Sequence, residues 1–431
     1  MKNIDIINLG CSKNLVDAEF LYTQLKANGI QVRLNPEATD ADTLIINTCG
    51  FIGDAKEESI NTILEAVGVK SQRPDSKLIV MGCLSQRYRT ELNNEIPEVD
   101  AFYGVNEIPA IIRDLGYQYF HDKLVHRLLS TANHYAYLKI AEGCDRSCAF
   151  CAIPMIRGKQ ISKPIDKLVD EAKYLSDQGV KELILISQEL TRYGIDIYNR
   201  PELVKLIDEL EKINGIEWIR LHYTYPNLFG DDLINVMTRS AKICNYLDIP
   251  FQHFNDKVLS IMKRGHTKED GLALIQKIRS RIPDIALRTT ILVGHPGEDE
   301  KAFRELYDAV KEIRFDRLGV FTYSHEEGTH SFKKYEDNIP SETKRERADE
   351  IMKLQQEISL TYNEKRVGTI QKVLIDKHEG EYFVGRTQYD SPEIDNEVLI
   401  KDSEEEISIG SFFDIKITEA TEFDLYGTSS F

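Results

Sequence analysis

The 431-residue sequence contains no apolar run long enough to cross a bilayer, and its start lacks a basic leader followed by an apolar core. We therefore expect a cytoplasmic protein with no membrane partner. Basic residues are in deficit, with 54 Lys and Arg against 71 Asp and Glu and a formal net charge of −17. This balance disfavours nonspecific adhesion to nucleic acid, although it would serve plain solubility equally well.

Cysteine is also scarce, with seven residues in the whole chain. An odd number of cysteines spread over a long chain favours metal ligation over disulfides in a reducing compartment. Cys244 lies within an apolar run and carries no partner signal, so we expect it in the core.

A fourth cysteine is missing where three others are clustered. Cys144, Cys148 and Cys151 have the spacing C-x3-C-x2-C, and no further thiol follows nearby. A [4Fe-4S] cube bound at every corner needs four thiolates, so this motif predicts a cluster with one open iron. An open iron can bind a small chelating ligand and pass it an electron. Zinc and buried inert thiols are the alternatives, and zinc is disfavoured because no second Cys or His pair lies nearby.

Residues 1–125 repeat a strand-then-helix rhythm that predicts an α/β domain with a parallel sheet. The expected strands are 4–9, 43–47 and 78–81, and the expected helices are 15–27, 55–67 and 86–93. Cys11, Cys49 and Cys83 each follow one of these strands. Loops at the carboxyl ends of parallel strands share one edge, so these thiols can converge on a second three-cysteine cluster. Each could instead be a small buried hydrophobe.

Residues 130–365 continue the rhythm with longer units, which predicts a partial (β/α)6 barrel. The expected strands are 137–141, 182–187, 218–223, 247–251, 287–293 and 318–323. Barrel sites lie at the carboxyl ends of strands, where Gln188, Gln252 and Glu298 are placed. We expect these three to bind a cofactor, although a helix cap or loop hydrogen bond would explain each one alone.

Residues 366–431 follow a charged helix expected at 341–366 and change to short strands, expected at 371–376, 382–387, 397–400 and 412–417. This succession of short strands predicts a small antiparallel OB-like barrel. From residue 371 onward the sequence has five basic and fifteen acidic residues, a balance of −10. Such a module should repel a phosphate backbone and attract a basic protein, unless runs such as Glu404–Glu406 form only a solvated face.

The motif around Cys144, with Phe150 before the third cysteine, resembles the signature of the radical S-adenosylmethionine enzymes. This resemblance implies that Cys144, Cys148 and Cys151 hold the [4Fe-4S] cluster that cleaves S-adenosylmethionine to a 5′-deoxyadenosyl radical, with the backbone at Phe150 near the adenine. The segment containing Gly294 resembles the family's glycine-containing approach to the same cofactor. The C-terminal region is similar to the TRAM module.

The order of these three parts resembles the methylthiotransferase family. The run LGCSKNLVDAE from Leu9, the pair Arg157-Gly158 and the run FDLYG from Phe423 are similar to the branch that modifies ribosomal protein S12. The resemblance implies that Cys11, Cys49 and Cys83 hold an auxiliary [4Fe-4S] cluster carrying the sulfur, and that a methylthio group is added to the β-carbon of an aspartate.

The same resemblance implies a low-potential electron donor such as flavodoxin or ferredoxin, and it leaves the sulfur source open. A tRNA methylthiotransferase acting on a modified adenosine is the alternative enzyme, which the acidic C-terminal region disfavours. A noncatalytic iron–sulfur scaffold is the third hypothesis.

Overall fold

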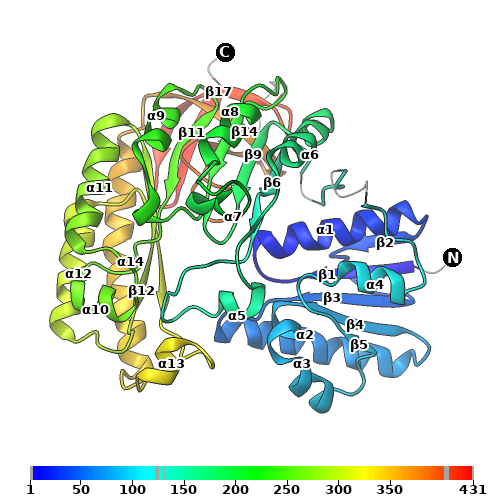
Figure 1. Ribbon diagram of the computed structural model, residues 1–431. Coiled ribbons are helices and arrows are strands. Elements are labelled where there is room, and N and C mark those ends of the chain that lie inside the picture. The colour runs from blue at the N-terminus through cyan, green and yellow to red at the C-terminus, as the bar shows by residue number, and fades with distance from the viewer. Residues whose placement is uncertain (1–2, 122–125, 131, 402–406, 430–431) are drawn as a thin grey trace.

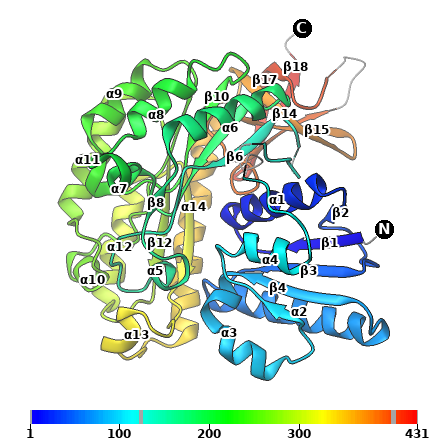
Figure 2. The ribbon, with the colours of Figure 1, turned by 45° about the vertical axis from the view of Figure 1, so that its right-hand side comes forward.

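The computed structural model describes residues 3–121, 126–130, 132–401 and 407–429 as three units (Figure 1). The N-terminal unit, in blue, lies beside a central unit in green to yellow, and the C-terminal unit is orange to red (Figure 2). These units confirm the predicted fold class. The acidic run Glu404–Glu406 lies outside the described residues.

The N-terminal unit is a parallel sheet in the order β2-β1-β3-β4-β5. The strands are β1 Asn3–Asn8, β2 Gln31–Leu34, β3 Thr43–Thr48, β4 Lys77–Gly82 and β5 Ala101–Phe102, and the helices are α1 Ser12–Ala27, α2 Gly53–Gln72, α3 Cys83–Glu95 and α4 Ile108–Asp114. Helices α1 and α4 cover one face and α2 and α3 the other, so β3 is buried along its whole length. Burial on both faces explains its apolar sequence. The short edge strands β2 and β5 were not predicted.

The central unit is a six-stranded parallel sheet in the order β13-β12-β11-β10-β9-β6. Its strands are β6 Tyr135–Lys139, β9 Glu182–Ile186, β10 Trp218–Leu221, β11 Ile243–Asp248, β12 Ala286–Val293 and β13 Arg317–Thr322. The predicted fourth strand, 247–251, was placed three to four residues too late in the sequence, since β11 spans Ile243–Asp248. Pro250 lacks an N–H to donate to a ladder, which limits how far the strand continues.

Helices cover the outer face of this sheet (Figure 1). The larger ones are α6 Ile165–Asp177, α8 Leu203–Leu210, α9 Asp231–Arg239, α11 Lys268–Arg281, α12 Glu300–Ile313 and α14 Ser341–Glu364. Shorter elements are α5 Ile153–Arg157, α7 Ile195–Tyr198, α10 Asp256–Ile261, α13 His330–Lys334 and the two-stranded pair β7 Ala141–Glu142 and β8 Ile161–Ser162. The outward side chains of the strands and the apolar faces of these helices form the largest core.

The inner face of the central sheet is covered by the other two units. Val16 and Phe20 of α1 pack against Tyr137 on β6 and against Ile184 and Ile186 on β9. These strand residues alternate with those that face the helices, as the two-residue period of a strand requires. The N-terminal unit therefore shares a core with the central one.

The C-terminal unit is a closed barrel in the order β14-β15-β16-β18-β17. Its strands are β14 Ile370–Glu379, β15 Tyr382–Thr387, β16 Glu397–Lys401, β17 Phe412–Ala420 and β18 Asp424–Ser429. Neighbouring strands are antiparallel except β16 and β18, which run parallel. A closed ring with an odd number of strands cannot alternate in direction throughout, so one parallel pair is unavoidable.

A loop of this barrel, residues 388–396, is inserted against the inner face of the central sheet. Arg317 on β13 donates to the buried carboxylate of Asp390 at 2.6 Å. Tyr246 on β11 donates to Asp395 at 2.7 Å. His222, just after β10, lies 2.9 Å from the hydroxyl of Ser391. The loop therefore fills the inner side of the partial barrel with paired polar groups.

Replacing Asp390 with alanine should destabilise this junction, because Arg317 would stay buried without its partner. Loss of one partner of a buried ion pair costs about 3–5 kcal/mol. Trp218 is the one tryptophan of the sequence, and its ring lies 4.7 Å from that of Phe412 across the junction. Urea unfolding followed by tryptophan fluorescence measures the effect directly.

Glu381→Ala is the matched control, because the Glu381–Lys401 pair is largely exposed at 3.4 Å. Exposed pairs contribute about 0–1 kcal/mol, so its unfolding curve should stay close to the parent's. Equal shifts for both variants would contradict the importance of the buried pair.

Candidate active site

The three cysteines of the N-terminal unit lie at one edge of its sheet. Cys11 follows β1 and is exposed, Cys49 follows β3 and Cys83 begins α3 after β4. These strands are adjacent, in the order β1-β3-β4. A Cβ added to Gly10 would lie 2.8 Å from that of Cys49, which shows how closely the first two loops approach. The structure thus brings together the three thiols that the sequence separates.

Burial makes two of these thiols hard to ionise alone. It raises the pKa of Cys83 to about 12 and also raises the pKa of Cys49. The charge of Arg157 opposes both shifts, and its Nη2 donates to Cys83 Sγ at 3.3 Å. A cation beside a buried thiol favours its thiolate form, which is the form that ligates metal.

The second triplet, Cys144, Cys148 and Cys151, lies on the loop between β7 and α5. The Cys144 N–H donates to Gly158 O at 3.0 Å, and the Cys151 N–H donates to Cys148 O at 3.2 Å. Burial raises the pKa of Cys144 to about 11 and that of Cys151 to about 12. Backbone contacts therefore hold the motif as one compact turn with partly sheltered thiols.

A second guanidinium lies beside Cys148. Arg264 donates to its Sγ at 3.2 Å, and the hydroxyl of Tyr225 lies 3.9 Å from the same sulfur. The Tyr225 ring is flanked by Arg264 and Arg146, whose guanidinium carbons lie 4.3 and 4.0 Å from its centroid. Arg146 is paired with Glu189 at 2.6 Å. No local sequence pattern singles out Arg264, because its partners are distant in the chain.

Three of the predicted cofactor residues are Phe150 within this loop, Gln188 and Gln252. Gln188, after β9, donates to Glu142 at 2.7 Å. Gln252 has the uncommon positive φ of 74° and pairs with β12 through an isolated bridge. The Phe150 ring lies 6.3 Å from that of His295. All three lie at the carboxyl edge of the central sheet, where barrel enzymes place their sites.

Gly294 and Glu298 lie in the loop after β12 and contact each other. The Gly294 N–H donates to Glu298 Oε1 at 3.0 Å, and Arg347 donates to the same oxygen at 2.7 Å. A Cβ added to Gly294 would lie 2.9 Å from Cδ of Lys344, so the missing side chain here makes room for α14. His253 Nε2 lies 3.2 Å from Glu298 Oε2, without hydrogen-bond geometry.

Buried polar atoms at this edge without a hydrogen-bond partner in the described part of the chain include Ser187 Oγ and Gln188 Oε1, whereas His253 Nε2 and Glu298 Oε2 lie against each other at 3.2 Å. Such atoms suit a polar ligand, because a buried donor or acceptor without a partner is costly. Within the described ranges, no group of three or more His, Cys, Asp and Glu side chains is arranged to hold a metal ion. The fit to iron–sulfur clusters rests on donor chemistry: three soft thiols per site with a guanidinium beside each set.

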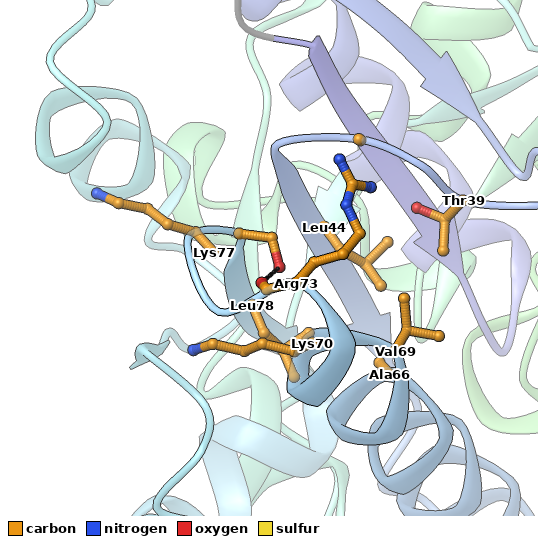
Figure 3. Close-up of a pocket in the computed structure, with 10 residues that line it drawn as sticks. Thr39, Leu44, Ala66, Val69, Lys70, Arg73, Lys77 and Leu78 are labelled. Atoms are coloured by element: carbon orange, nitrogen blue, oxygen red, sulfur yellow. Dashed lines mark hydrogen bonds between the residues drawn. The ribbon is translucent and has the colours of Figure 1, made fainter.

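A pocket in the N-terminal unit lies at the opposite end of β3 and β4 from the cysteines (Figure 3). Its lining includes Leu44 and Leu78 near the starts of these strands and Arg73 at the end of α2. It contains no predicted site residue. The chemistry-bearing side chains thus gather at the carboxyl edges of both sheets.

Comparison with known families agrees with this arrangement. Residues 3–104 match the uncharacterized protein family UPF0004, residues 138–310 the Radical SAM superfamily and residues 367–429 the TRAM domain. Ribosomal protein uS12 methylthiotransferase RimO of Bacteroides thetaiotaomicron is 51% identical over 425 residues, covering 99% of this chain and 98% of that protein. The chain belongs to this methylthiotransferase family. The RimO protein of Phocaeicola vulgatus is 52% identical with the same coverage.

Solved structures with the same fold are more distant. The radical S-adenosylmethionine methyltransferase TsrM from Kitasatospora setae has a TM-score of 0.56 at 13% identity, covering 88% of this chain and 79% of that one. The cobalamin-dependent radical enzyme OxsB has a TM-score of 0.53 at 12% identity, covering 82% and 56%. These likenesses support the fold, and the relatives confirm the predicted family and enzyme class. Family membership implies a [4Fe-4S] cluster and S-adenosylmethionine. No helix among the described residues is long and apolar enough to span a membrane.

Proposed function

We propose that this protein transfers a methylthio group to the β-carbon of an aspartate in ribosomal protein S12. Cys144, Cys148 and Cys151 hold the [4Fe-4S] cluster that reacts with S-adenosylmethionine, and Cys11, Cys49 and Cys83 hold an auxiliary [4Fe-4S] cluster. When bound, these clusters supply the electron for cleavage of S-adenosylmethionine and an open iron for the sulfur. Phe150, Gln188, Gln252, Gly294 and Glu298 surround S-adenosylmethionine, with Gln188 offering its unpartnered Oε1.

The observation that carries this proposal is the connection between the two cysteine sites through Arg157 and Gly158. Arg157 reaches Cys83 of one triplet, while the adjacent Gly158 accepts a hydrogen bond from Cys144 of the other. Two sites joined through consecutive residues suit a reaction in which a radical formed at one would remove a hydrogen atom from the substrate carbon, and the resulting carbon radical would capture the methylthio group held at the other. A single electron-transfer centre needs no such pairing.

The choice of S12 as substrate rests on the names of the relatives and on the acidic charge of the C-terminal region. The relatives are named for their action on uS12, and the C-terminal region from residue 371 carries a balance of −10. An acidic module attracts a basic ribosomal protein and repels a phosphate backbone. We place the reaction in the cytoplasm, with flavodoxin or ferredoxin as electron donor. The N-terminal methylthiotransferase domain is assigned to residues 1–125, the radical core to 130–365 and the TRAM domain to 366–431.

Incubation of the anaerobically reconstituted protein with purified S12 and, separately, with tRNA tests the proposal. We expect mass spectrometry to show one added methylthio group on an S12 aspartate, dependent on S-adenosylmethionine and a reductant. A control without reductant should give no product, because cleavage needs an electron. A mass gain on tRNA alone would establish the alternative, a tRNA methylthiotransferase.

A further inference from the structure

Arg157, at the end of α5, has an unusually complete set of partners for one buried side chain. Its Nη1 contacts Glu142 at 2.8 Å and Asp17 at 3.2 Å. Its Nη2 donates to Asn14 and, at 3.3 Å, to Cys83 Sγ. The side chain is 2% exposed. Because Asn14, Asp17 and Cys83 are themselves buried, these contacts hold the guanidinium in a defined position beside the auxiliary triplet.

The residue after Arg157 is hydrogen-bonded through its backbone to the other triplet, Cys144, Cys148 and Cys151. Gly158 follows Arg157 directly and accepts the hydrogen bond from the Cys144 N–H at 3.0 Å. Glu142, the partner of Arg157, lies two residues before Cys144. Two consecutive residues therefore connect the two cysteine sites, one through its side chain and one through its carbonyl.

The charges around this contact are nearly balanced. Lys139 pairs with both Asp17 and Glu142, the two carboxylates that also pair with Arg157. Two buried cations thus face two buried carboxylates, and Arg157 is the cation that contacts a cysteine sulfur. Loss of Arg157 would leave an excess of negative charge beside the auxiliary triplet.

We propose that Arg157 is a positioning residue that sets the reduction potential of the cluster on Cys11, Cys49 and Cys83, independently of the other cluster. This inference rests on the proposed ligation of two clusters. A hydrogen bond and a positive charge at a ligating sulfur stabilise the reduced, more negative cluster and raise its potential. Arg264 stands in the same relation to Cys148, so each site has its own guanidinium.

Redox titration of two full-length backgrounds tests this assignment. Cys144→Ala/Cys148→Ala/Cys151→Ala retains only the auxiliary triplet, and Cys11→Ala/Cys49→Ala/Cys83→Ala retains only the radical triplet. Each background is reconstituted anaerobically, reduced stepwise with dithionite in the presence of mediators, and followed by electron paramagnetic resonance. Arg157→Gln and Arg157→Lys are introduced into both, with Arg264→Gln as the matched control.

We expect Arg157→Gln to shift the auxiliary potential at least about 59 mV more negative, a tenfold change in a one-electron equilibrium constant. Arg157→Lys keeps the charge and should recover most of the shift. Arg264→Gln should lower the potential of the radical cluster and leave the auxiliary one unchanged. An unchanged auxiliary potential in Arg157→Gln, or equal shifts of both clusters, would overturn the inference.

If Arg157→Gln binds no auxiliary cluster, recovery of binding by Arg157→Lys supports the positioning role, and failure of both variants to bind overturns it. The unsubstituted chain separates this inference from the proposed function. About eight irons per chain are expected for two [4Fe-4S] clusters. A count near four there would overturn the two-cluster proposal itself, a result distinct from an unchanged potential.

Discussion

Cys148→Ala should abolish cleavage of S-adenosylmethionine while the chain retains about four irons, and Cys49→Ala should keep cleavage but lose methylthio transfer. The reason is that the two triplets lie on different sheets, each held by its own loops. Removal of one thiol therefore damages one site and leaves the other folded. Iron and sulfide analysis, assay of 5′-deoxyadenosine and mass spectrometry of S12 measure the three outcomes.

Cys244→Ala is the matched control for these variants. Cys244 is buried among Trp218, Tyr246, Ala286 and Leu374 and touches neither triplet. We expect this variant to keep about eight irons and both activities. Iron falling to zero in Cys148→Ala or Cys49→Ala would contradict two independent sites.

Gly143→Ala should remove the radical site through the backbone alone, without touching a cysteine. Gly143 has a φ of +78°, and an added Cβ would lie 2.6 Å from the carbonyl carbon of Lys159. The left-handed conformation alone costs a non-glycine residue roughly 1–2 kcal/mol. The collision is with backbone, so the loop carrying Cys144 must move. We expect loss of about four irons and of S-adenosylmethionine cleavage.

Gly29→Ala is the control that separates the steric clash of an added Cβ from the cost of a positive φ. Gly29 has a similar φ of +75°, but nothing lies within 4 Å of an added Cβ. This variant should lose stability by roughly 1–2 kcal/mol and keep its iron and both activities. Retention of parental cleavage by Gly143→Ala would show that the loop tolerates the displacement.

The part of the site that could be predicted from sequence is the part that follows from periodicity. Cys11, Cys49 and Cys83 each come just after a buried strand, and parallel strands end at one edge, so their convergence follows from chain direction. The C-x3-C-x2-C motif is local and needs no folding to be recognised. The family match added roles that periodicity cannot supply.

The contacts that join the units could not be predicted in this way. Arg157 was noticed only as part of a motif, since its partners Asn14 and Cys83 are 143 and 74 residues away. No local sequence pattern indicates the role of Arg264 either, because its partner Cys148 is 116 residues away. Side-chain hydrogen bonds over such separations leave no periodic trace in a sequence. The edge strand β2 was missed because it is only four residues long, and a run this short is hard to distinguish from a loop even though its residues alternate between polar and apolar.

The inserted loop, residues 388–396, gives the C-terminal unit a structural role in the central unit. A region that looks like a detachable recruiting module also supplies Asp390 and Asp395 as counter-charges for buried arginines of the central strands, Arg317 and Arg288. The loop that carries these carboxylates therefore also lines the inner side of the central sheet, where it contacts Arg317, Tyr246 and His222. Removal of the C-terminal unit would therefore leave buried polar groups of the central sheet without their partners, so we expect the two units to lose stability together.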